Sequence, residues 1–413
     1  MQHKIYRSEN VLEAAQARVT ETFDNFDKIF VSFSGGKDSS VMLHLVLDEA
    51  IKRGRKVGVL IIDFEAQYKR TADHVQEMLE LYEPHIEPYW VCLPIKLRNA
   101  SSNFEPVWTA WDPERKDDWV RPVPKHSGVV SAPDYFDWFQ PNMEFEEFIV
   151  LFADWYAGDG VAAAFVGIRA DESLNRFRTI CTFNKETWSG KRWTTKVTDN
   201  AYNIYPIYDW VTKDIWKYHS VFPDKPHNEI YDLMHQAGVK PSQQRLCQPY
   251  GDDQRRGLWL YHLLEPETWY KVVARVNGVN SGALYIQERG NVNGYNKITL
   301  PEGHNYESFC RLLLQTMPKV TRDHFIERFK GFIKGWKGRG YVNGIPDFAP
   351  KVLEDAQWAP SYRRLCKVLL RNDWWCKGLG MTQPKSDAYS RYMDIKKAKK
   401  ASAIIEGSVD GTC

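Results

Sequence analysis

The residues with the clearest chemical potential are 34–40, whose sequence is Ser-Gly-Gly-Lys-Asp-Ser-Ser. Two glycines let backbone N–H groups approach phosphate oxygens with no Cβ in the way, and the start of a following helix adds its positive end. The lysine supplies a point charge and the serines supply hydroxyl donors. The pattern predicts a phosphate-cradling loop made of Ser34, Gly35, Gly36, Lys37, Asp38, Ser39 and Ser40.

The spacing of this loop differs from a Walker A motif, which has four residues between its first glycine and Gly-Lys-Ser/Thr. A kinase or GTPase of that type is therefore disfavoured. The string SGGKDS resembles the PP-loop of the ATP pyrophosphatase superfamily, whose members split ATP between the α- and β-phosphates and often adenylate a substrate. A Gly-Gly pair alone is more often an ordinary tight turn, so the prediction depends on Lys-Asp-Ser and on the elements around the loop.

A second group of polar residues, Gly-Ile-Arg-Ala-Asp-Glu-Ser, follows the apolar run 162–166. We expect Arg169 to face the phosphate loop, because guanidinium groups suit bidentate recognition of phosphate or sulfate. Taken alone, the group is more simply a helix cap with salt bridges. Together with the loop it predicts an anion site formed by Gly167, Arg169, Asp171, Glu172, Ser173 and Arg176.

Apolar and amphipathic stretches indicate the elements that position these residues. Near-continuous apolar runs are typical of parallel strands buried on both faces, and apolar residues at helical spacing separate them. The predicted strands are 28–33, 57–62, 86–92 and 162–166, and the predicted helices are 11–23, 39–52 and 68–82. This order indicates a doubly wound α/β sheet, whose ligand lies beyond the carboxyl ends of the strands. The segments that fall there are 34–38, 63–65 and 167–169.

Several segments together are similar to the phosphoadenosine phosphosulfate (PAPS) reductase family over about residues 20–240. They are Ser34–Ser39, Asp63–Glu65, Gly167–Ser173 with Arg176, and Tyr205–Trp210 with Asp214–Trp216. The resemblance implies the adenine-nucleotide α-hydrolase-like (Rossmann-like) fold, adenosine near Asp63 and Glu65, and Mg²⁺ at Asp38 when ATP is the ligand. We expect the catalytic residues to be Lys37, Asp38 and Arg169, with the two cations offsetting developing charge.

One departure from the family bears on the reaction. PAPS reductases carry a C-terminal Glu-Cys-Gly-Leu-His motif, whereas this chain ends Val-Asp-Gly-Thr-Cys. Cys247 is the remaining candidate thiol, although a buried structural cysteine is the commoner case. We therefore expect ATP, or a PAPS-like adenine nucleotide, to be cleaved at the α-phosphate to adenylate or modify an acceptor. A PAPS reductase or sulfur-transfer enzyme is an alternative.

The C-terminal part is predicted to be mainly helical and basic. Residues 318–400 hold 19 Lys and Arg against 8 Asp and Glu, a net charge of +11, whereas the rest of the chain, with 36 against 45, carries −9. Such a surface is either a solvated basic face or a site for a polyanion such as DNA or RNA. The aromatic stripe Phe325, Phe329, Phe332 and Trp336 has helical spacing, which favours a core over a base-stacking platform.

The segment 245–258 resembles the uncharacterised domain attached to PAPS-reductase-like proteins of the immunoglobulin-binding-regulator A type. Those proteins are commonly paired with a small ParB/sulfiredoxin-like protein, so the resemblance implies that partner. A second hypothesis, of a different class, is a nucleotide-sensing regulator or coactivator that binds DNA or RNA together with this partner.

Size and composition bound these hypotheses. At 413 residues the chain is long enough for two domains, which we predict at 1–240 and 241–413, with a Trp- and Pro-rich insertion or lid at 94–142. Seven dispersed cysteines indicate reduced thiols, and the sequence has no run of about 18 apolar residues. We expect a cytoplasmic protein with no membrane partner.

Overall fold

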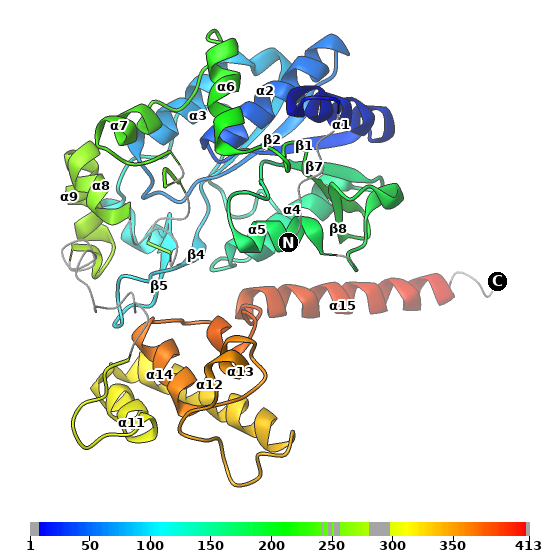
Figure 1. Ribbon diagram of the computed structural model, residues 1–413. Coiled ribbons are helices and arrows are strands. Elements are labelled where there is room, and N and C mark those ends of the chain that lie inside the picture. Colours follow the sequence, from blue (N-terminus) through cyan, green and yellow to red (C-terminus); the bar gives the residue numbers. More distant parts are fainter. Residues whose placement is uncertain are drawn as a thin grey trace.

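The computed structural model describes residues 8–182, 184–241, 243–246, 250–251, 257–280 and 298–409, with side chains to residue 398 in the last helix. Figure 1 shows a sheet with helices on both sides, a second group of helices next to it, and a long C-terminal helix that runs back along the sheet part.

The main sheet has seven strands in the described residues, in the order β6-β3-β2-β1-β7-β9-β8. Neighbouring strands are parallel except for β8, which pairs antiparallel with β9. The strands are β1 (Lys28–Ser32), β2 (Val57–Ile62), β3 (Ile86–Val91), β6 (Val129–Val130), β7 (Ala162–Val166), β8 (Thr194–Thr198) and β9 (Ala201–Ile204). The strand order reverses between β1 and β7, which is where doubly wound sheets bind their ligands.

Helices cover both faces of this sheet. Figure 1 shows α1, α2, α3 and α6 on one side and α4 and α5 on the other. Their bounds, with the neighbouring α7, are α1 (Val11–Asn25), α2 (Lys37–Lys52), α3 (Lys69–Leu81), α4 (Phe145–Ala157), α5 (Leu174–Cys181), α6 (Thr212–Val221) and α7 (Ile230–Gln236). The predicted α/β fold with a parallel sheet and an added helical part is confirmed, whereas α4, β8 and β9 were not predicted.

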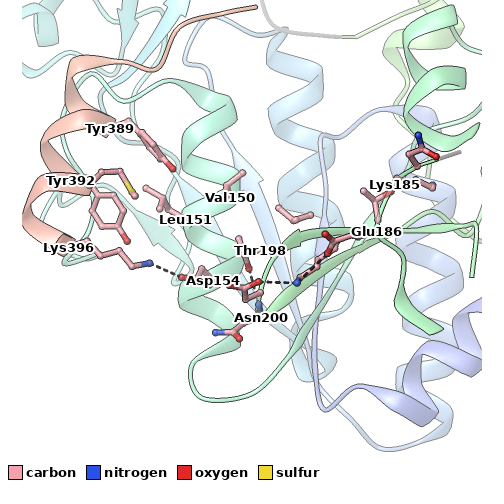
Figure 2. Close-up of a pocket in the computed structure, with 16 residues that line it drawn as sticks. Val150, Leu151, Asp154, Lys185, Glu186, Thr198, Asn200, Tyr389, Tyr392 and Lys396 are labelled. Carbon is pink, nitrogen blue, oxygen red and sulfur yellow. Dashed lines mark hydrogen bonds and ion pairs between the residues drawn. The ribbon is translucent and has the colours of Figure 1, made fainter. Parts of the chain in front are cut away.

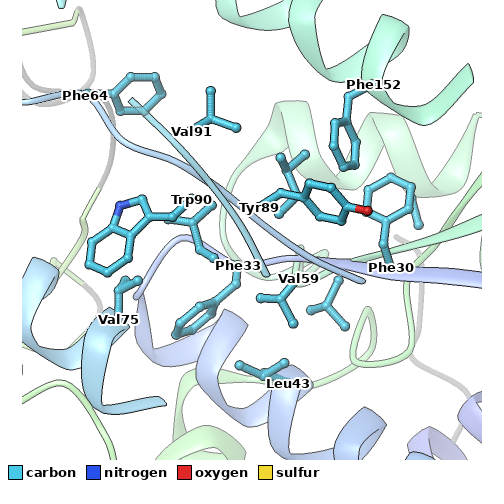
Figure 3. Close-up of a cluster of buried hydrophobic side chains, with 14 of the residues drawn as sticks. Phe30, Phe33, Leu43, Val59, Phe64, Val75, Tyr89, Trp90, Val91 and Phe152 are labelled. Carbon is cyan, nitrogen blue, oxygen red and sulfur yellow. The ribbon is translucent and has the colours of Figure 1, made fainter. Parts of the chain in front are cut away.

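Aromatic side chains fill the space between the sheet and α4. The ring of Phe152 packs against the neighbouring rings of Phe30 and Tyr89, with centroids 5.2 and 5.3 Å away (Figure 3). Phe33 and Leu43, each 1% exposed, belong to the same core at the end of β1 and on α2. Burial of each such side chain contributes about 1.5–3 kcal/mol, so the end of β1 is held on a rigid base.

The segment 94–142 contains elements that the sequence analysis did not predict. The strands β4 (Ile95–Arg98) and β5 (Val107–Ala110) pair antiparallel, η2 (Pro113–Asp118) is a 3-10 helix, and β6 joins the edge of the main sheet. Trp108, Trp111 and Trp138 are buried in the first hydrophobic core. These tryptophans are therefore core residues, and a role of the segment as a lid stays a prediction.

Two helices beyond residue 250 complete the first core. They are α8 (Leu258–Leu264) and α9 (Pro266–Arg275). The rings of Tyr68 and Tyr261 stack with centroids 3.8 Å apart. The carboxylate of Glu265 accepts from the N–H groups of Lys69 and Arg70 at 2.7 and 3.0 Å, and so caps the start of α3 from a distant part of the chain.

Three of the next helices build a second hydrophobic core. They are α11 (Tyr306–Thr316), α12 (Lys319–Lys337) and α14 (Tyr362–Leu370), and the short helix α13 (Lys351–Asp355) lies between α12 and α14 in the sequence. Phe325, Phe329 and Phe332 lie in this core with 5% exposure or less. The core interpretation of the aromatic stripe is confirmed, whereas the domain boundary after residue 240 stays a prediction.

The last helix, α15 (Asp387–Val409), begins against α4. Ser386, just before it, donates from its N–H and its hydroxyl to the carboxylate of Glu147 at 2.7 and 2.5 Å. Gln383 donates to Glu144 at 2.5 Å. The chain thus returns to its first part, and neither α15 nor another helix in the described residues is long and apolar enough to cross a membrane.

Candidate functional site

The loop between β1 and α2 has the backbone shape that its glycines allow. Gly35 has φ +69°, and a Cβ there would lie 2.9 Å from Cγ2 of Thr71, so both the dihedral angle and the space require glycine. Gly36 is the N-cap of α2, so the first N–H groups of the helix face the loop. Gly167, at the end of β7, permits close approach because a Cβ there would lie 3.2 Å from Cα of Ser39.

Two serine hydroxyls fix the loop in this shape. The Ser39 hydroxyl accepts from the N–H of Gly36 at 3.1 Å, donates to the Gly36 carbonyl at 2.9 Å and lies 3.0 Å from the Ser34 hydroxyl. Ser40 donates to the same carbonyl at 3.1 Å and contacts Nε2 of His74 at 2.9 Å. Burial lowers the pKa of His74 to about 3, so this ring is neutral at ordinary pH. Ser39 and Ser40 are buried, whereas Ser34 is exposed at the mouth of the loop.

Three charged side chains meet at the carboxyl ends of β1 and β7. Nε of Arg169 donates to Oδ1 of Asp38 at 2.5 Å, and Nζ of Lys37 lies 3.2 Å from Oδ2. Arg169 is 2% exposed; its Nη1 has no hydrogen-bond partner and lies 4.0 Å from the carboxylate of Asp171. A buried guanidinium and an ammonium group that share the carboxylate of Asp38 are suited to an anionic ligand.

The other predicted polar residues of the second segment have partners within residues 169–176. Ser173 is the N-cap of α5 and accepts from the N–H of Arg176 at 3.2 Å. Nε of Arg176 lies 3.8 Å from the carboxylate of Glu172, and the side chain of Asp171 is 48% exposed. These contacts match the cap and salt-bridge interpretation, and a binding role for these residues stays a prediction.

Asp63 and Glu65 follow β2 and are buried among protein donors. Asp63 accepts from Nε1 of Trp90 at 2.8 Å and from Arg121 at 2.5 Å. Glu65 accepts from Nε and Nη2 of Arg275 at 2.8 and 3.1 Å, and from two backbone N–H groups of the segment 94–142 at 2.7 and 3.2 Å. Protein groups therefore already donate to the acceptor sites of both carboxylates. The predicted contact of Asp63 and Glu65 with adenosine stays a prediction.

Three residues that the sequence analysis did not select contact the loop. Asn228 is fully buried and its Nδ2 donates to the carbonyl of Gly35 at 2.8 Å. The Tyr231 hydroxyl accepts from the N–H of Lys37 at 3.1 Å, and the carbonyl of Gln244 accepts from Nζ of Lys37 at 3.1 Å. These contacts span 193 to 207 residues and depend on tertiary structure, so no local sequence signal marks them.

The residues at Asp38 do not fit a Mg²⁺ ion held by protein carboxylates. Both oxygens of Asp38 are paired with cations, Oδ1 with Nε of Arg169 and Oδ2 with Nζ of Lys37. Mg²⁺ in proteins takes one or two free carboxylates together with phosphate oxygens and waters. The metal role predicted for Asp38 therefore has no support from this geometry.

The predicted thiols are not described by the structure, and one pocket lies apart from the loop. Cys247 and Cys413 are outside the described residues, as is most of the segment 245–258. A pocket of about 780 Å³ lies between α4, β8 and α15, and Figure 2 shows the ion pair of Asp154 and Lys396 on one of its walls. Its lining includes none of the site residues predicted from the sequence.

Residues 28–237, half of the chain, match the family model of the phosphoadenosine phosphosulfate reductase domain. The chain belongs to this family. Residues 238–347 match a second model, a domain of unknown function called DUF3440. The phosphate loop and Arg169 lie in the PAPS reductase range, whereas Gln244 and Arg275 lie in the DUF3440 range. The candidate site therefore draws on both matched segments.

Named relatives of this PAPS reductase family member extend the comparison. The uncharacterized protein YbdN of Escherichia coli (strain K12) is 41% identical over 401 residues, which is 96% of this chain and 97% of the relative. The uncharacterized protein MJ0066 of Methanocaldococcus jannaschii is 27% identical over 216 residues, 52% of this chain and 36% of the relative. The fold is similar to that in a crystal structure of PAPS reductase from Candida auris, in a phosphate complex. The superposition covers 56% of this chain and 94% of the reductase chain, with 14% sequence identity and a TM-score of 0.31.

Proposed function

We propose that this protein binds ATP, or a related adenine nucleotide, with its phosphates on the loop 34–40. The observation that carries the proposal is Arg169, which is 2% exposed beside the loop and whose Nη1 lacks a hydrogen-bond partner. A buried donor without an acceptor costs free energy, and phosphate oxygens are acceptors that a guanidinium recognises well. Membership in the PAPS reductase family supports an adenine nucleotide as the anion.

The inferred reaction takes place at the α-phosphate. An acceptor oxygen or nitrogen forms a new bond to the α-phosphorus, and the bond from that phosphorus to the bridging oxygen of the β-phosphate breaks. Pyrophosphate leaves with the electron pair, and the proton of the acceptor passes to solvent. Lys37 and Arg169 offset the charge that develops, while Ser34, Gly35 and the start of α2 cradle the pyrophosphate. A Mg²⁺ ion would arrive bound to the nucleotide, as part of the substrate.

Release of AMP and pyrophosphate from ATP and Mg²⁺ tests this function. Arg169→Ala is expected to lower turnover on the order of 100-fold, because it removes a preorganised donor for the phosphates. Lys52→Ala, at the other end of α2, is the matched control, since that lysine is 73% exposed. The proposal fails if the products are ADP and phosphate, or if Arg169→Ala binds and cleaves ATP as well as Lys52→Ala does.

A thiol-dependent reaction on PAPS is the alternative that the family name raises. It needs a cysteine nucleophile, and the candidates are Cys247 and Cys413. PAPS turnover measured with a thiol reductant decides the point. A double variant, Cys247→Ser with Cys413→Ser, that keeps the wild-type rate would remove this alternative.

A second candidate function is nucleotide-dependent binding of DNA or RNA. Lys330, Lys334 and Lys337 are exposed on one face of α12, and the guanidinium of Arg339 lies 4.8 Å from the ring of Trp336. Cations beside an aromatic ring fit single-stranded nucleic acid. The resemblance to the immunoglobulin-binding-regulator A type adds a ParB/sulfiredoxin-like protein as the partner of such a regulator.

Charge reversal on α12 tests this second function. Lys330→Glu with Lys334→Glu and Lys337→Glu is expected to lower the affinity for a single-stranded oligonucleotide at least about 10-fold at 50 mM salt, and to flatten its salt dependence. Lys319→Glu with Arg322→Glu is the control at the other end of the helix, where Asp323 already lies within 3.6 Å of both cations. Equal losses in both variants would show that this face is not the binding surface.

A further inference from the structure

Residues 243–246, which we call the Gln244 strap, contact both walls of the phosphate site. The carbonyl of Gln244 accepts from Nζ of Lys37 at 3.1 Å, and Gln244 is 2% exposed. On the other wall, the guanidinium of Arg245 donates to the carbonyl of Glu172, next to the N-cap of α5. The strap therefore connects the phosphate loop to the segment that carries Arg169.

The strap is tied to α7, which contacts the loop as well. Nε2 of Gln244 donates to the carbonyls of Val239 and Tyr231 at 3.1 and 3.4 Å. The hydroxyl of Tyr231 lies 3.1 Å from the backbone nitrogen of Lys37, and its ring centroid lies 5.1 Å from Nζ. The strap and α7 are thus linked, and each provides one oxygen to Lys37. The Tyr231 hydroxyl accepts from the backbone N–H of Lys37, and the Gln244 carbonyl accepts from its Nζ.

These oxygens occupy two of the donors that an anion on the loop can use, the N–H of Lys37 and one of the three N–H groups of its Nζ. A helix N-terminus binds phosphate through its first N–H groups, and a lysine beside it adds a point charge. Lys37 is 5% exposed, so the two protein oxygens replace solvent at its donors. A phosphate oxygen can take their place only when the Tyr231 hydroxyl and the Gln244 carbonyl move away.

We propose that the Gln244 strap is a displaceable plug of the phosphate site, which nucleotide phosphates open by replacing its oxygens on Lys37. This inference rests on the proposed function, because it needs a nucleotide on the loop. The strap lies in the range 238–347 that matches DUF3440, so its release transmits the occupancy of the loop to that segment. In the closed state the strap oxygens contact Lys37, and in the open state they have moved away. Because nucleotide binds only the open state, its apparent affinity is the intrinsic affinity multiplied by the fraction of molecules that are open.

A substitution in the strap gives the first test. Gln244→Ala removes the amide that ties the strap to Val239 and Tyr231 but keeps the backbone carbonyl. Loss of one or two hydrogen bonds from the closed state is expected to tighten binding of α,β-methylene ATP about 2- to 10-fold. Gln243→Ala, which changes an exposed neighbour, is the matched control and should bind like the wild type. Unchanged or weaker binding by Gln244→Ala would overturn the plug.

Hydrogen exchange on the wild-type protein gives a second test that depends on no variant. The N–H of Gln243 donates to the carbonyl of Lys240 at 2.8 Å, and we expect it to exchange several-fold faster when α,β-methylene ATP is bound. Slower exchange would mean that the strap clamps the ligand, and would overturn the plug. If neither the analogue nor pyrophosphate binds the wild type, the proposed function fails and the plug fails with it. If they bind while exchange is unchanged, the plug alone fails.

Discussion

Replacement of Glu65 by glutamine is expected to destabilise the fold more than it weakens nucleotide binding. The carboxylate is 0% exposed and accepts two hydrogen bonds from Arg275 and two from backbone N–H groups. Arg275 is itself 5% exposed. Glu65→Gln keeps the shape of the side chain and removes its charge, so the guanidinium stays buried without a counter-ion.

The magnitude follows from the burial of both partners. Removal of one member of a buried ion pair costs about 3–5 kcal/mol. The amide oxygen of the new side chain still accepts hydrogen bonds, so we expect a loss of about 3 kcal/mol in the free energy of unfolding. Arg275→Met should cost a similar amount, because it leaves Glu65 unpaired. The double variant carries neither charge, so the two losses should fall short of additive by about 2 kcal/mol.

Urea unfolding of the three variants, followed by tryptophan fluorescence, measures this cycle. The Kd for α,β-methylene ATP is measured on the same proteins under conditions where each is folded. A direct contact of Glu65 with adenosine predicts a different pattern: a weaker Kd for Glu65→Gln and a stability loss below about 1 kcal/mol. That pattern, or additive losses in the cycle, would refute the ion-pair explanation.

Two further predictions concern stability. Gly35→Ala should lower the free energy of unfolding by about 2–5 kcal/mol, because φ is +69° and the new Cβ would lie 2.9 Å from a side-chain carbon of α3. Gly54→Ala is the control, with φ +61° and nothing within 4 Å, and should cost about 1 kcal/mol. Equal losses of the two variants in urea unfolding would contradict the steric argument. Burial lowers the pKa of His74 to about 3 and the pKa of His44 and His219 to about 4 in the folded protein. In the unfolded chain the pKa of histidine is about 6.5. Below about pH 6.5 the unfolded chain therefore binds more protons than the folded protein does. The free energy of unfolding should therefore fall as pH drops from about 6.5 toward 4, by up to about 2 kcal/mol per histidine at pH 5, and a flat urea midpoint across this window would be evidence against it.

The central sheet could be predicted from the sequence because its strands are continuous apolar runs. The predicted 57–62 and 162–166 coincide with β2 and β7, and the ends of β1 and β3 differ by one residue. The strands β8 and β9 were missed because Thr-Thr-Lys-Val-Thr and Ala-Tyr-Asn-Ile, near the edge of the sheet, lack such a run. The phosphate loop was found because its chemistry is encoded in contiguous residues.

The partners of the site residues could not be predicted, because they come from distant segments without a motif. The position of Asp63 and Glu65 at the end of a strand follows from the sequence, but their pairing with Arg121 and Arg275 depends on how the segment 94–142 and α9 fold back onto the sheet. The contact of Tyr231 with the loop could not be predicted either, because a single tyrosine 194 residues away in the sequence carries no motif that marks it.

A fragment that ends at residue 237, where the match to the PAPS reductase domain ends, would leave Tyr68 without the ring of Tyr261 and the start of α3 without the carboxylate of Glu265. The end of the match to the family model is therefore not the end of the folded unit. Recombination that exchanged the C-terminal segment at that point would expose part of the sheet core and favour aggregation. A viable exchange would have to keep α8 and α9 with the sheet, so the two matched segments are expected to be inherited together.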